Sequence, residues 1–184
     1  MRFEPRKHLT MLRRRDQTSG MLILAPPLIR PASAADGPAI QRVLWDTFES
    51  TWRPQVTPEA ADDFLGRDEP AAYFARRGAH FWIAKRDGAV VGFVDWDGDF
   101  VNALHVLAAH ARSGVGAALM DAAEAAIAAA GFPAARLETD TFNERSQAFY
   151  AARGYVEADR YPDLEWASGL TTLLLVKPLS PDKA

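Results

Sequence analysis

The 184-residue sequence has no cysteine, no long apolar run and no large excess of charge of either sign. Without cysteine there can be no disulfide bond, no thiolate metal site and no cysteine nucleophile. Because no run of about 18 apolar residues occurs, we expect no membrane span and no membrane partner. The net charge of −3 gives no electrostatic reason to expect nucleic acid as a partner. What remains is an ordinary globular composition, 48% hydrophobic, with enough residues for one domain and a substantial core.

The N-terminus is unusual in composition, because its basic residues far outnumber its acidic ones. We expect residues 1–21 to form a flexible basic tail and residues 22–184 to form a single domain. A start at Met11 or Met21 is an alternative interpretation of this tail. The apolar run MLILAPPLI that follows superficially matches a secretory signal. Two prolines interrupt that run and Arg30 follows it, so we favour a cytoplasmic protein over a secreted one.

Hydrophobic periodicity and turn residues predict an alternation of strands and helices. Asp87-Gly88 and Asp97-Gly98 are dipeptides favoured in tight hairpin turns, and they separate three strand-like segments, which predicts an antiparallel meander. The order of elements indicates a mixed sheet with helices on both faces. The predicted strands are 28–30, 79–86, 89–96, 100–107, 136–139, 155–161 and 171–177; the predicted helices are 36–52, one beginning at Thr57-Pro58, a short one around Tyr73-Phe74, 114–130 and 143–153.

Gly114 and Gly116 lie where a strand leads into a helix. Glycines there let the backbone approach a ligand and expose N–H groups, and the helix dipole favours an anion such as a pyrophosphate. A tight strand-to-helix turn is the alternative explanation. The segment is not a dinucleotide fingerprint, because Leu119 occupies the third glycine position.

Asn143 and Tyr150 belong to a second short helix, which Gly154 ends. Asparagine is a favoured helix cap, and this alone explains Asn143; its amide could also bind an extended, amide-bearing chain. Tyr150 is either a buried structural tyrosine or a phenol that protonates a thiolate leaving group. Taken singly, each residue favours the structural explanation.

Taken together, these motifs resemble a known family. The pattern F-N-x-x-S-x-x-F-Y-x-x-x-G-Y from Phe142 to Tyr155 follows the strand–G-x-G–helix unit, and this combination resembles the GNAT superfamily of acyl-coenzyme A-dependent N-acyltransferases. The resemblance covers about residues 28–178 in element order. It implies an α/β (α+β mixed) fold with a mixed, mostly antiparallel sheet of about seven strands. Helices cover both faces of this sheet, and its fourth and fifth strands splay apart.

The resemblance also implies residues that bind acetyl-CoA, the co-substrate. Ala111 stands where the family's pyrophosphate loop has glutamine or arginine, and Ala108 replaces the usual proline; both are departures. Adjacent Arg112 could supply charge from another direction. Backbone N–H groups make most of that contact, so we expect weakened binding. The implied cofactor-binding residues are Leu104, Val106, Arg112, Ser113, Gly114, Val115, Gly116, Ala117, Asn143, Ser146 and Tyr150.

For catalysis, the resemblance assigns Tyr150 as general acid. Glu138 is the first choice for the base, by similarity to members that acetylate protein N-termini, and His105 is the second. Asp95, Asp97 and Asp99 are further alternatives near the meander. The acceptor side falls on the first helices and the final hairpin, whose aromatic residues would suit an amine. The predicted substrate-binding residues are Phe48, Trp52, Tyr73 and Trp166.

The predicted function is therefore transfer of an acetyl group from acetyl-CoA to a primary amine of a small molecule or peptide, without a metal ion. The alternative is a non-catalytic GNAT-fold protein that binds acyl-CoA as a sensor or regulator; the Ala111 departure favours it. A third hypothesis is a secreted or membrane-associated basic-tailed protein with a coincidental α/β pattern. A homodimer is expected by family analogy alone.

Overall fold

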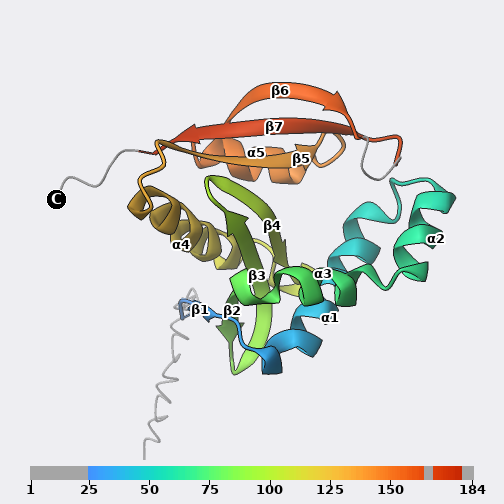
Figure 1. Cartoon of the computed structure of the whole chain (residues 1–184), viewed down its shortest axis with the longest axis horizontal. Helices are drawn as coiled ribbons and strands as arrows, with labels where there is room; N and C mark the ends of the chain where they lie inside the picture. The colour runs from blue at the N-terminus through green and yellow to red at the C-terminus, as the bar shows by residue number, and fades with distance from the viewer. Residues whose placement is uncertain (1–24, 164–167, 180–184) are drawn as a thin grey trace, which may run out of the picture.

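The structure, a computed structural model, describes residues 25–163 and 168–179. Strands form one sheet, and helices pack against both of its faces (Figure 1). The predicted tail, residues 1–21, and the predicted substrate-binding residue Trp166 lie outside the described residues. The strands are β1 (Leu28–Pro31), β2 (Trp82–Arg86), β3 (Ala89–Asp97), β4 (Phe100–Val106), β5 (Ala134–Asp140), β6 (Val156–Pro162) and β7 (Thr171–Pro178). The helices are η1 (Ala34–Asp36), α1 (Gly37–Thr47), η2 (Phe48–Trp52), α2 (Pro58–Gly66), α3 (Glu69–Arg77), η3 (Gly78–His80), η4 (Ala108–His110), α4 (Val115–Ala129) and α5 (Glu144–Ala152).

The sheet has seven strands in the order β1-β2-β3-β4-β5-β7-β6. All neighbouring pairs are antiparallel except β4 and β5, which are parallel. β5 pairs with β7 along its whole length, from Ala134 to Asp140, whereas it pairs with β4 only at Phe100–Arg136 and Val101–Leu137. The two strands therefore diverge after their first residues. This confirms the predicted mixed sheet and its splay between the fourth and fifth strands.

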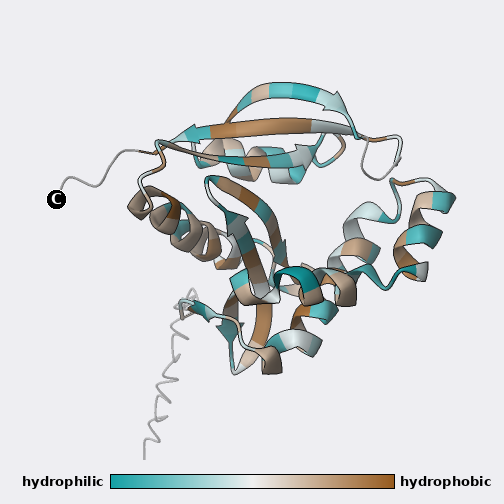
Figure 2. Cartoon of the chain, viewed as in Figure 1, coloured by the Kyte–Doolittle hydropathy of each residue, from teal (hydrophilic) through white to brown (hydrophobic). Residues whose placement is uncertain are grey.

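Alternating side chains of the meander build a hydrophobic cluster on each face of the sheet. On β3, Val91 and Val94 belong to the cluster under α4, whereas Val90 and Phe93 belong to the cluster under α1 and α3. The members of each cluster are three residues apart, and not two, because Val91 is the extra residue of a bulge: Val90 pairs with Lys85 and Gly92 with Ala84. In Figure 2 the central strands and α4 are predominantly apolar, while the edge strand β6 is hydrophilic. The core thus fixes β4 between two helical layers.

The two hairpin turns differ slightly from each other. Asp87 and Gly88 both have positive φ, at 50° and 79°, which matches the predicted two-residue turn. The second turn is Gly98-Asp99, one residue later than predicted, because Asp97 still pairs with Phe100. A bulge between Asp95 and Trp96 accommodates the shift in register.

The start of the first helix also differs in part from the prediction. Asp36 is the N-cap residue of α1, as predicted, but its side chain caps no N–H of that helix. It instead reaches back to the Ser33 N–H at 2.8 Å, in a capping box with Ser33, the N-cap of the preceding turn η1. Arg30 forms two hydrogen bonds with the Asp36 carboxylate, which lowers the pKa of that carboxyl well below its usual range. The helix then ends in a turn of π-helix, η2, where a continuous α-helix was predicted.

Within the described ranges, no helix is long and apolar enough to cross a membrane.

Candidate functional site

A cavity of about 720 Å³ opens where β4 and β5 diverge. One side is formed by β4 and β5, another by the α1–α3 region, and the start of α5 closes the end. Thr47 and Trp52 from the first helices, His105 from β4, Asp140 from β5 and Tyr150 from α5 all line it. A single cavity therefore brings together residues that are far apart in the sequence.

The open edge of β4 presents backbone groups to this gap. Leu107 donates its N–H to the Val91 carbonyl at 2.9 Å, so these two residues form a hydrogen-bonded pair of the β3–β4 ladder. The pair of His105 and Phe93, two residues along, is of the same kind. Because hydrogen-bonded and non-hydrogen-bonded pairs alternate in an antiparallel ladder, the N–H and C=O groups of Leu104 and Val106 point away from β3. They point toward β5, which no longer pairs with them there. This edge is free to pair with an extended ligand chain.

The loop before α4 is shaped like an anion-binding site. Arg112 and Gly114 have φ values of 55° and 85°, and Gly114 is the N-cap of the helix. Among the described residues, the N–H groups from Arg112 to Ala117 find no acceptor, and Ala118 is the first to donate, to the Gly114 carbonyl. Successive unpaired N–H groups at the positive end of a 15-residue helix favour a bound phosphate.

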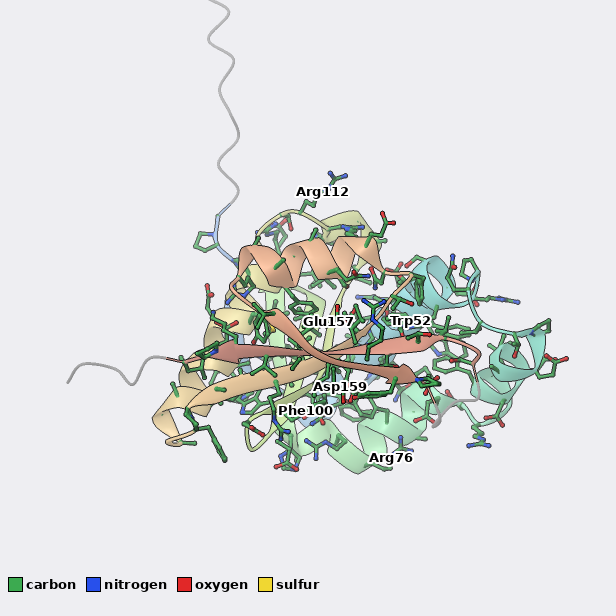
Figure 3. All side chains as sticks on the ribbon, turned by 90° about the horizontal axis from the view of Figure 1, so that it is seen from above. Trp52, Arg76, Phe100, Arg112, Glu157 and Asp159 are labelled. Atoms are coloured by element: carbon green, nitrogen blue, oxygen red, sulfur yellow. The ribbon has the colours of Figure 1, made fainter. Side chains whose placement is uncertain are left out.

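Other residues hold this loop in place. Arg86 donates from Nη2 to the Ser113 carbonyl at 3.1 Å, and the Ser113 hydroxyl donates to the His110 carbonyl at 2.5 Å. At the start of η4, the Asp46 carboxylate accepts from the Ala108 N–H at 2.8 Å. The Arg112 side chain projects from the loop away from the ribbon (Figure 3). Positive charge at this loop therefore comes from the helix dipole, from Arg86 and from the outward-pointing Arg112.

Asn143 caps α5 and also faces the cavity. Its Oδ1 accepts from the Ser146 N–H at 3.1 Å, so the structural explanation of this asparagine is correct. Its Nδ2 group has no partner among the described residues and is available to a ligand carbonyl. Ser146, one turn into the helix, lines the same cavity. Capping therefore occupies the oxygen of this side chain and leaves its nitrogen unused.

Tyr150 is buried in the layer between α5 and the sheet and still lines the cavity. Its ring packs edge-on against Phe149 and Tyr155, with centroids 5.2 and 5.6 Å apart. Burial raises the pKa of its phenol well above the usual value, and the nearby Arg153 charge opposes this effect. The hydroxyl makes no hydrogen bond to any residue in the described part of the chain. It is therefore a protonated, uncommitted donor at neutral pH.

Two carboxylates lie on the same face of β5, because Glu138 and Asp140 are two residues apart. Glu138 is exposed and accepts a short hydrogen bond from the Tyr161 hydroxyl. Asp140 is partly buried and accepts from the Trp52 indole N–H at 3.0 Å. Burial raises the pKa of Asp140; the Trp52 hydrogen bond opposes this, and the charges of Asp163 and Glu138 add to it. Sequence reasoning missed Asp140, although its spacing from Glu138 was a usable signal.

His105 is held on β4 by Thr47 of α1, whose Oγ1 lies 2.8 Å from Nδ1. The same hydroxyl donates to helix carbonyls, at 3.0 Å from Val43 and 3.1 Å from Leu44. We infer that Nδ1 carries the imidazole proton and that Nε2 is the acceptor. Burial lowers the pKa of His105 to about 4. The imidazole is therefore neutral at pH 7, as the prediction required, but weakly basic.

Aromatic side chains form the wall of the cavity on the helical side. Phe48 stacks on Phe64 with centroids 3.9 Å apart, and both line the cavity together with Trp52 and Tyr73. Three of the four predicted substrate-binding residues are thus in the cavity. Trp82 and Trp96 pack on each other against the core, as predicted for structural tryptophans.

The remaining proposed bases are ion-paired. Asp95 is fully buried, Arg77 binds it through two nitrogens at 2.9 Å each, and the Tyr73 hydroxyl donates to it at 2.8 Å. Asp97 pairs with Arg77 and Asp99 with Arg136. These carboxylates pair with arginines of α3 and β5, and none of the three lines the cavity. Among the described residues there is also no cluster of side chains that could hold a metal ion.

Comparison with known proteins bears on this site. The Acetyltransferase (GNAT) family model matches residues 38–155, which is more than half of the chain. No curated protein matches the sequence. Among solved structures, a GCN5-related N-acetyltransferase from Rhodopseudomonas palustris is similar, with 24% identity and a TM-score of 0.72 over 87% of this chain and 100% of that one.

Two further structures share the fold. Ard1 from Thermoplasma volcanium has 21% identity and a TM-score of 0.65, over 85% of this chain and 99% of that one. The PaiA N-acetyltransferase from Thermoplasma acidophilum, in complex with coenzyme A, has 18% identity and a TM-score of 0.67, over 84% and 99% of the two chains. At these identities the structures support the fold alone. Together with the family match over residues 38–155, they establish that this chain belongs to the GNAT acetyltransferase family.

Proposed function

We propose that this protein is an N-acetyltransferase that moves an acetyl group from acetyl-CoA directly to a primary amine of a small molecule or peptide. The observation that carries the proposal is the divergence of β4 and β5 above a helix start with unpaired N–H groups. The gap, the loop before α4 and the cavity are connected through β4. An extended thioester could therefore lie in the gap along β4 while an amine enters from the cavity, and the two would meet at Tyr150.

The residues present suit acetyl-CoA. The N–H groups from Arg112 to Ala117 would hold the pyrophosphate, in the manner of other helix N-termini. The pantetheine arm would pair with Leu104 and Val106 on the open edge of β4, and the Asn143 Nδ2 group would donate to one of its amides. The structurally similar PaiA enzyme is in complex with coenzyme A, which supports this assignment. Ala111 contributes no side chain, but the backbone groups of the loop remain.

The chemistry requires a base, an oxyanion donor and an acid. A backbone N–H on the open edge of β4 would polarise the thioester carbonyl. Tyr150 would protonate the departing thiolate, and its raised pKa keeps it protonated at working pH. Glu138, Asp140 and His105 are the candidates for receiving the amine proton. No acyl-enzyme is expected, because the chain has no cysteine.

The alternative, a non-catalytic acyl-CoA sensor, is favoured by Ala111 alone. Calorimetric titration with acetyl-CoA followed by a free-thiol assay separates the two functions. The assay uses three amines of different chemistry: 1,4-diaminobutane, tyramine and a short peptide with a free N-terminus. Binding with thiol release supports the enzyme, binding without release on a wider amine panel supports the sensor, and no binding contradicts both.

A further inference from the structure

We propose that Asp140 is the residue that receives the acceptor amine: it binds the incoming ammonium ion and takes up its first proton. The proposal rests on the acetyltransferase function proposed above and assigns the acceptor side of the same site. It also gives the acceptor a chemical class, an organic cation. In this proposal Glu138, the base suggested by family resemblance, does not accept the proton and acts only as a negative charge near Asp140.

The position of Asp140 carries the argument. It lies at the C-terminal end of β5, where the strand has left β4 and faces the cavity. Trp52 reaches it from η2 across 88 positions of sequence, and the indole N–H fixes Oδ2 at 3.0 Å. The other oxygen, Oδ1, accepts no hydrogen bond within residues 25–163 and 168–179. One oxygen is thus held in place while the other is available to an ammonium group.

The two rivals are less suited to this task. Glu138 is exposed and committed to the Tyr161 hydroxyl, so water competes with any ammonium at its carboxylate. His105 is neutral and its pKa is lowered to about 4, so it offers no charge to a cation and little basicity. Asp140 combines a negative charge with partial burial, and a Coulomb interaction is stronger where water is partly excluded.

Charge balance in the cavity points to a cationic acceptor. The arginines of the lining are internally compensated: Arg76 pairs with Glu69, and Arg77 pairs with buried Asp95. Glu138 and Asp140 have no cationic partner in the described part of the chain. The Trp52 indole binds Asp140 through its N–H, and its ring centroid lies 5.6 Å from that of His105, which gives a flat aromatic surface next to Asp140. An ammonium group on an aliphatic or aromatic body fits both features.

In the proposed reaction two protons leave the amine, and one of them is returned to Tyr150. The ammonium nitrogen gives its first proton to Asp140, which passes it to solvent. The free amine attacks the thioester carbonyl carbon, so that a C–N bond forms and the C–S bond breaks with its electron pair on sulfur. The thiolate takes the proton of the Tyr150 hydroxyl. The second proton leaves the nitrogen through solvent and restores the phenol.

The test compares Asp140→Asn with Glu138→Gln in the full chain. Both replacements are isosteric, and the asparagine oxygen can still accept from Trp52, so we expect both variants to fold with unchanged acetyl-CoA affinity. With tyramine and 1,4-diaminobutane, kcat/KM of Asp140→Asn should fall by about 10²-fold or more, the usual contribution of a general base. The loss in Glu138→Gln should be at least about tenfold smaller.

The pH dependence of kcat at saturating amine tests whether Asp140 titrates during catalysis. A residue with a purely structural role would not change the position of the acidic limb. Trp52→Phe removes a hydrogen bond that favours the charged carboxylate, so the acidic limb should shift to higher pH. Glu138→Gln removes a neighbouring negative charge, so the same limb should shift to lower pH. Opposite shifts in these two variants identify the titrating group as Asp140.

An NMR experiment tests binding without turnover. The indole N–H signal of Trp52, identified by its loss in Trp52→Phe, reports on the Asp140 carboxylate. Tyramine or 1,4-diaminobutane should shift this signal in the wild-type protein and leave it unmoved in Asp140→Asn.

Equal kcat/KM losses in Asp140→Asn and Glu138→Gln, or an indole signal that no amine moves, would overturn the assignment of Asp140. Failure of the wild-type protein to bind acetyl-CoA would instead contradict the proposed function itself.

Discussion

Replacing Tyr150 by phenylalanine should separate catalysis from stability. The Tyr150 hydroxyl forms no hydrogen bond with the described residues, while its ring is buried against Phe149 and Tyr155. Phenylalanine keeps the ring contacts and removes one oxygen. The free energy of unfolding should therefore change by no more than about 0.5 kcal/mol, as for substitutions that break no interaction.

Activity should respond very differently. A positioned general acid contributes about 10²–10⁴-fold to the rate. We expect kcat of Tyr150→Phe to fall by at least about 10²-fold, which raises the activation free energy by about 2.7 kcal/mol. Acetyl-CoA affinity should stay close to that of the wild-type protein, because the phenol proton is needed only as the thiolate leaves. Thiol release, calorimetry and urea denaturation of the same preparation measure the three quantities.

Tyr73→Phe provides the contrasting stability result. The Tyr73 hydroxyl donates to the fully buried Asp95 carboxylate at 2.8 Å, so its loss should cost about 1.5–3 kcal/mol of unfolding free energy. Tyr150 is not the general acid if Tyr150→Phe keeps kcat within about threefold of wild type. If that variant loses as much stability as Tyr73→Phe, the Tyr150 hydroxyl has a structural partner and is not an uncommitted donor.

Three further predictions follow from individual contacts. Glu124 is buried and binds both Arg153 at 3.0 Å and Lys177 at 2.5 Å, so Glu124→Ala should lower the unfolding free energy by about 3–5 kcal/mol in urea denaturation. The pKa of His105 is about 4 when folded, below its ordinary value, so the unfolded chain binds the extra proton; stability should fall by about 1.4 kcal/mol per pH unit as pH drops from about 6.5 toward 4, and His105→Asn should remove this dependence. Arg86→Met should weaken acetyl-CoA binding by up to about tenfold in calorimetry, because it frees the Ser113 carbonyl and loosens the loop before α4.

Local sequence signals accounted for much of the fold. Asp87-Gly88 and the cap at Asn143 are short-range features whose geometry depends on a few neighbouring residues, and both were predicted correctly. The splay between β4 and β5 came from family resemblance. No local pattern encodes it, since it depends on which strands pair across the sheet.

The acceptor side was less predictable, because its residues meet only in the folded chain. Trp52 and Asp140 are 88 positions apart, and Arg77 and Asp95 belong to different elements. Asp95 was considered a rival base because it is a carboxylate near the meander; its complete burial behind Arg77 was not readable from the sequence. The spacing of Asp140 from Glu138 placed both on one face of the strand, but nothing local marks a strand-end aspartate as partly buried, and Asp140 was overlooked.

The open gap in the sheet can persist because each of its edges is held independently. β4 pairs with β3 along most of its length, and β5 pairs with β7 from Ala134 to Asp140. Below the gap, α4 packs against both β4 and β5, so the two halves share one core. Across the opening, the indole of Trp52 binds Asp140 and ties η2 to the end of β5. The same contact that orients the proposed amine-binding carboxylate therefore also joins the helical wall of the cavity to the strand that opens the site.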